Sequence, residues 1–206
     1  MIWITDAGSS GAFGIVCACV GMAAASFFIY ALHDWAEALA ARAMGDKTVG
    51  LSFSYVGQMR SGFNIMSSVM LLLFGIGWKT HIKSDETRRA RSIGTSLCGP
   101  LACFALGIIV FIILQAASRL YAEHSILILQ AVIYLLKGAF RACIMISVFS
   151  LFPLKPFDGG YILRALCPGR LQTLMDSSEK ISLAAAIFAT ALVSALGLSG
   201  GINLNI

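Results

Sequence analysis

Three ionisable side chains, His33, Asp34 and Glu37, follow a long apolar stretch and could bind a metal ion. The preceding segment, Ala12–Leu32, contains no charged residue. If the helix expected there continues through Arg42, His33 and Glu37 stand at positions i and i+4, on one face and one turn apart. The zinc motif H-E-x-x-H uses this spacing, with two imidazoles on the metal and a glutamate that polarises a water. The pattern here is H-D-x-x-E.

A fourth candidate, Asp158, lies in the sequence SLFPLKPFDGGYIL that follows a later apolar stretch. Pro153 and Pro156 interrupt the helix, so Asp158 and its two glycines fall where the chain is not helical. The carboxylate has two interpretations. It could cap the helix that follows, or it could be a third metal ligand for His33 and Glu37. The second is favoured because charged groups inside a membrane need partners.

The composition predicts an all-α, polytopic transmembrane helix bundle that forms one integral membrane domain over residues 1–206. Of the 206 residues, 58% are hydrophobic and 12% are charged, against roughly a quarter charged in soluble domains. A span needs about 20 mostly apolar residues. We expect five spans, or six if Lys137 and Arg141 break the fourth. The expected spans are Ala12–Leu32, Phe63–Trp78, Ile93–Ala117, Ile126–Phe152 and Ile181–Leu198.

The net charge of +5 does not predict nucleic-acid binding, because the basic residues are spread through the loops between spans. The segment from Lys79 to Arg91 is rich in lysine and arginine and, by the positive-inside rule, is expected in the cytoplasm. The N-terminus is then cytoplasmic too, in a multi-pass protein of the cell membrane. The six cysteines show no metal-ligand spacing and are interpreted as small apolar residues.

Several sequence segments together resemble the site-2 protease family of intramembrane zinc metalloproteases. They are the HDWAE helix with AARAMGD after it, GIGWK before the basic segment, CGPLA at the start of a span, and LFPLKPFDGG at the end of another. The resemblance covers roughly Ile29 to Leu166 and is to compact bacterial members that lack a PDZ domain. It implies a site-2-protease-like core, transmembrane protein segments as substrates or partners within the lipid bilayer, and a zinc ion.

Four positions differ from the family's motifs. Asp34 replaces the general-base glutamate and Glu37 replaces the second histidine ligand. Cys103 and Ser150 each replace an asparagine, in the G-P-x-x-N stretch and before the proline-rich turn, where the resemblance implies a groove for a substrate or partner. His33 and Asp158 match the family.

These replacements alter the expected chemistry. Aspartate is one methylene shorter than glutamate, which moves its carboxylate by about 1.5 Å, and a misplacement of about 1 Å can slow a reaction 100-fold. A site of one imidazole and two carboxylates offers harder ligand atoms than the site of the family does. It could prefer another divalent metal to Zn²⁺, or hold none.

Two functions therefore compete. The first is a degenerate, non-cleaving homologue that binds transmembrane partners. The second is an active intramembrane metalloprotease, with the metal held by His33, Glu37 and Asp158 and with Asp34 as the catalytic base. A transport role, with a proton relay through the carboxylates, is the weakest interpretation because the sequence shows no inverted repeat.

Overall fold

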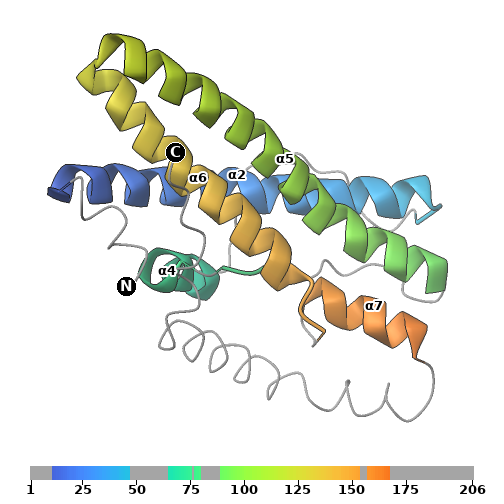
Figure 1. The fold of residues 1–206 in the computed structure, drawn as a ribbon. Helices are drawn as coiled ribbons and strands as arrows, with labels where there is room; N and C mark the ends of the chain where they lie inside the picture. The colour runs from blue at the N-terminus through green and yellow to red at the C-terminus, as the bar shows by residue number, and fades with distance from the viewer. Residues whose placement is uncertain (1–10, 47–64, 76, 80–88, 154–156, 168–206) are drawn as a thin grey trace.

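The computed structural model describes residues 11–46, 65–75, 77–79, 89–153 and 157–167, and the regular structure in these ranges is entirely helical (Figure 1). The predicted all-α class is confirmed for this part of the chain. The helices are α2 (Gly11–Ala43), α4 (Ile65–Phe74), α5 (Arg89–His124), α6 (Leu127–Ser150) and α7 (Asp158–Leu166).

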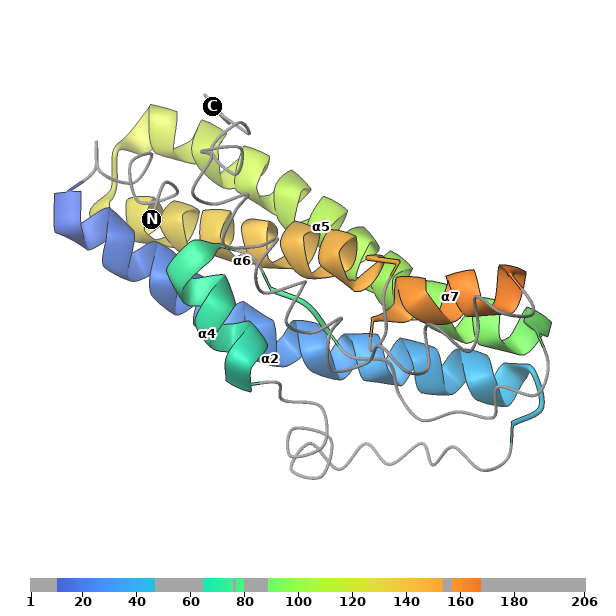
Figure 2. The ribbon, with the colours of Figure 1, turned by 90° about the horizontal axis from the view of Figure 1, so that it is seen from below.

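The three long helices, α2, α5 and α6, pack against one another, and each is long and apolar enough to cross a membrane. Helices α5 and α6 form an antiparallel pair that crosses α2, as Figures 1 and 2 show. Large apolar side chains cover the outside of α2 and α5, for example Phe28, Leu101 and Ile112, which are about three-fifths exposed. Such surfaces suit a lipid environment rather than water.

Helices α2 and α6 approach closely because each presents a glycine to the other. A Cβ atom built at Gly21 would lie 2.7 Å from the Cα atom of Leu135, and one at Gly138 would lie 3.1 Å from the backbone nitrogen of Met22. Neither space could hold a side chain. Small residues at such crossings are how membrane helices gain packing contact without a hydrophobic driving force.

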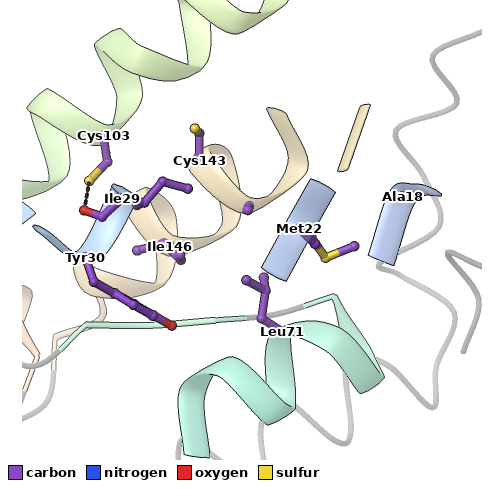
Figure 3. Packing of buried hydrophobic residues seen from close by; sticks show 9 residues of the cluster. Ala18, Met22, Ile29, Tyr30, Leu71, Cys103, Cys143 and Ile146 are labelled. Carbon is purple, nitrogen blue, oxygen red and sulfur yellow. Dashed lines mark hydrogen bonds between the residues drawn. The ribbon is translucent and has the colours of Figure 1, made fainter. Parts of the chain in front are cut away.

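The main hydrophobic core lies where these helices meet α4 (Figure 3). Ile29 and Tyr30 of α2 contribute to it together with Cys103 of α5, Ile146 of α6 and Leu71 of α4, and all five are buried. This core fixes the part of α2 that directly precedes His33.

The structure corrects the expected spans in two places. Helix α4 covers only Ile65–Phe74 and ends at Gly75, which has a φ of +73°, so the continuous span expected over Phe63–Trp78 is wrong. Its 10 residues rise about 15 Å, half of a typical hydrocarbon core. Helix α6 is continuous through Lys137 and Arg141, so the break that would have added a sixth span is also wrong. The expected span Ile181–Leu198 lies outside the described residues.

Candidate metal centre

Helix α2 continues well beyond its apolar stretch and so places His33 and Glu37 on one buried face. It runs to Ala43, and the chain turns at Gly45, which has a φ of +87°. The side chains of both residues are completely buried, and His33 Nδ1 lies 3.8 Å from Glu37 Oε1. The predicted pairing of these two residues one turn apart is confirmed.

Asp158 reaches the same place from the start of α7. Its carboxylate is completely buried, and Oδ2 lies 3.1 Å from His33 Nε2. Helix α7 begins at Asp158, with Phe157 as its N-cap. Asp158 thus starts this helix, as the capping interpretation expected, but the expectation that Asp158 and its two glycines lie where the chain is not helical is wrong. Helix α7 can begin here because Gly159 has no side chain: a Cβ atom there would lie 2.6 Å from the carbonyl oxygen of Phe152.

His33, Glu37 and Asp158 thus form a compact group of metal-ligand types. One donor atom from each lies within 4.8 Å of the other two, and all three residues are buried. Donors bound to one tetrahedral zinc at 2.0 to 2.2 Å stand roughly 3.3 to 3.6 Å apart, close to the 3.1 Å between His33 and Asp158. Imidazole and carboxylate are both ordinary ligands of divalent metals, so the donor set fits such an ion.

Gly99 of α5 leaves room for the His33 ring. A Cβ atom at this position would lie 2.6 Å from Nδ1 and 2.8 Å from Nε2 of His33. The helix backbone therefore lies directly against the imidazole and limits its rotation. This is the glycine of the CGPLA segment, and its requirement here is steric.

Asp34 does not stand alone beside the three candidate ligands, because it forms an ion pair with Lys79. Lys79 Nζ lies 3.1 Å from Asp34 Oδ1, and both side chains are less than a tenth exposed. Lys79, which the sequence suggested to be one of the loop charges that set membrane topology, is therefore buried in an ion pair. A signal for the pair was present: a carboxylate inside an apolar bundle requires a cation, and Lys79 directly follows the apolar segment GIGW.

The short segment Gly77–Lys79 is held in place by the hydroxyl groups of Ser67 and Ser150, and Tyr30 in turn bonds to Ser67. The Ser67 hydroxyl donates to the carbonyl oxygen of Trp78 and accepts from its N–H, at 2.5 and 2.7 Å. Because the Ser67 proton is used there, the Tyr30 hydroxyl donates to Ser67 Oγ at 2.7 Å. The N–H of Lys79 donates to Ser150 Oγ at 3.2 Å. The segment is therefore fixed to α2, α4 and α6.

The two residues expected to line a substrate or partner groove are both fully buried. Cys103 belongs to the main hydrophobic core, with Sγ 3.8 Å from the carbonyl oxygen of Ile29 (Figure 3). Ser150 binds the backbone of Lys79. In this structure the position around Ser150 is thus taken by the chain's own segment Gly77–Lys79.

The charges of the site can be counted from five side chains. Asp34, Glu37 and Asp158 are three carboxylates, Lys79 is one ammonium group, and a neutral His33 leaves a formal charge of −2. Either of two arrangements would reduce this charge: a divalent cation on the three candidate ligands, or a protonated His33 between Glu37 and Asp158. Buried charges are stable only when compensated.

Comparison of the sequence with protein-family models and with curated proteins finds no match, and comparison with solved structures finds none either.

Proposed function

We propose that this chain is a site-2-protease-like membrane protein that binds a divalent metal ion inside its helix bundle and does not cleave peptides. His33, Glu37 and Asp158 are the ligands in this proposal, and transmembrane segments of other proteins are its partners. The observation that carries it is the convergence of three buried ligand-type side chains from α2 and α7.

The metal part of the proposal is supported by charge and by space. A divalent ion would compensate the carboxylates of Glu37 and Asp158, which are buried together with His33. Gly99 holds the imidazole against both carboxylates, and an alanine there would displace the ring. A bound divalent ion would supply Lewis-acid chemistry and would link α2 to α7.

The absence of cleavage is supported by the surroundings of Asp34. A general base must reach the proton that it removes, but Asp34 Oδ1 is held 3.1 Å from the ammonium group of Lys79. A second carboxylate ligand, Glu37, adds negative charge and weakens the acidifying effect of a metal on water. The buried segment Gly77–Lys79 also blocks an extended peptide from Ser150.

The partner surface in this proposal is the outside of the bundle. Helices α2 and α5 present rows of exposed apolar side chains, which another transmembrane helix can contact as readily as lipid can. Partners would therefore bind without reaching the metal site.

The alternative is an active intramembrane metalloprotease with the same three ligands and with Asp34 as base. One observation favours it: the ligand positions of an H-x-x-x-E helix and a D-G turn are brought together as such an enzyme requires. In that case Lys79 would have to release Asp34 when substrate binds.

The test combines metal analysis with a cleavage assay on detergent-purified protein. We expect about one zinc, manganese or iron ion per wild-type chain, and loss of at least nine-tenths of it in His33→Ala and Asp158→Asn. His124→Ala is the matched control, because His124 is 61% exposed at the end of α5. Its metal content should equal that of the wild type.

Cleavage is measured on a panel of single-span proteins reconstituted with the chain in lipid vesicles. The proposal predicts no product from wild-type protein carrying metal. Product that disappears in both His33→Ala and Asp34→Asn would support the protease instead. A wild-type chain with no bound metal after purification and zinc loading would contradict both functions.

A further inference from the structure

We infer that Lys79 is a positioning residue that holds Asp34 out of the metal's ligand set and thereby determines which metal the site prefers. This inference rests on the proposed metal site. It assigns a role to a lysine that is not one of the three candidate ligands and that forms an ion pair with Asp34.

The position of Asp34 makes such a role necessary. On an α-helix Asp34 lies about 60° around the axis from Glu37 and next to His33 in the chain. Asp34 is 6% exposed as a whole residue, so its carboxylate lies inside the bundle. A buried carboxylate beside a cation site becomes a ligand unless another group binds it more favourably.

Lys79 provides that other group, and its own position is rigid. Its N–H is bound by Ser150, and both backbone groups of the preceding Trp78 are bound by Ser67. The Trp78 ring packs edge-on against Phe157, with centroids 6.2 Å apart. Phe157 directly precedes Asp158, a candidate ligand. The segment Gly77–Lys79 therefore positions the Lys79 ammonium group beside Asp34 and, through Trp78, also packs against the neighbour of Asp158.

The expected consequence concerns metal preference. With Lys79 present, the metal is offered one nitrogen and two carboxylates. Without Lys79, Asp34 can become a third carboxylate ligand of the metal. The ligand set then contains more hard oxygen donors and more negative charge. Carboxylate-rich sites favour manganese relative to zinc more than imidazole-rich sites do.

The experiment measures the zinc-to-manganese ratio bound by purified protein from an equimolar mixture of the two ions, by mass spectrometry of the metals. In Lys79→Met the ratio should fall by at least about threefold relative to wild type. In Lys79→Arg, which keeps the charge, it should fall less. In the double variant Asp34→Asn with Lys79→Met it should return to the wild-type value, because the third carboxylate is gone.

The double variant keeps the test decisive if Lys79→Met alone does not fold, since it removes both charges together and leaves neither unpaired. A double variant that folds but has a ratio more than about threefold from the wild type would overturn the inference, as would an unchanged ratio in a folded Lys79→Met. Both results would leave the proposed metal site intact. A wild-type chain that binds neither ion would instead overturn the proposed function itself, and the inference with it.

Discussion

The two halves of α2 associate with the rest of the bundle in different ways. The first half meets α6 through glycines, with Gly21 and Gly138 each packed against the opposite backbone. The second half meets α7 and the segment Gly77–Lys79 through buried charges, with His33 facing Asp158 and Asp34 facing Lys79.

The first contact is close backbone packing, and the second is a set of buried charges. Close backbone packing gains contact at little cost in a membrane. Buried ion pairs seldom improve on apolar packing in stability. Stability alone therefore does not explain the five ionisable groups gathered beside the second half of α2, and metal binding is the explanation that we propose.

The largest effect is expected at the helix crossing. Gly138→Val should prevent stable folding, or lower the free energy of unfolding by more than about 3 kcal/mol, because the added carbons would overlap the backbone of α2. Thermal unfolding in detergent measures it. Leu127→Ala, on the same helix but 65% exposed, is the control and should change stability by less than about 0.5 kcal/mol. Similar melting temperatures for the two variants would show that the crossing is not tight.

A smaller effect on folding, but a large one on metal content, is expected at Gly99. Gly99→Ala should displace the His33 ring and lower the bound metal at least about tenfold, since changing a residue that orients a metal ligand commonly costs about 10- to 100-fold in metal affinity. The control is Gly94→Ala on the same helix, whose added Cβ would meet only the end of the Met44 side chain, 2.8 Å from its Cε atom. Equal metal loss in the two variants would contradict a specific role for Gly99.

The smallest effect is expected at Ser67, whose hydroxyl bonds both to Tyr30 of α2 and to the backbone of Trp78. Ser67→Ala removes the hydroxyl that bonds to both the N–H and the carbonyl oxygen of Trp78. The substitution should destabilise the protein by about 1–3 kcal/mol. The control is Ser26→Ala, because Ser26 Oγ only donates to the Ala23 carbonyl within its own helix. Melting temperatures give the comparison. A smaller shift for Ser67→Ala than for Ser26→Ala would mean that the Gly77–Lys79 segment is not held by Ser67.

The sequence alone predicted the parts of the structure that depend on residues close together in the chain. The long apolar helices follow from the length of the uncharged stretches, and the pairing of His33 with Glu37 follows from their i, i+4 spacing. The meeting of His33 with Asp158 was predicted from the need to compensate buried charge, and the 3.1 Å separation confirms that meeting.

Two other features that depend on tertiary contacts were not predicted. Lys79 was assigned to a solvated loop because a lysine beside other basic residues usually is one, and only the ion pair with Asp34 places it in the core. Helix α4 ends early since the chain after Gly75 bonds to Ser67 and Ser150 instead of continuing the helix. The need of Asp34 for a buried cation was the one available sign of the ion pair, and sequence spacing gives no sign of the contacts with Ser67 and Ser150.

The ligand set is tested most directly by X-ray absorption at the edge of the bound metal in zinc-loaded, detergent-purified protein. The account predicts nitrogen and oxygen neighbours at about 2.0–2.2 Å with the scattering of one imidazole, and loss of the imidazole signal in His33→Ala. A sulfur neighbour at about 2.3 Å, or an imidazole signal that survives His33→Ala, would contradict it.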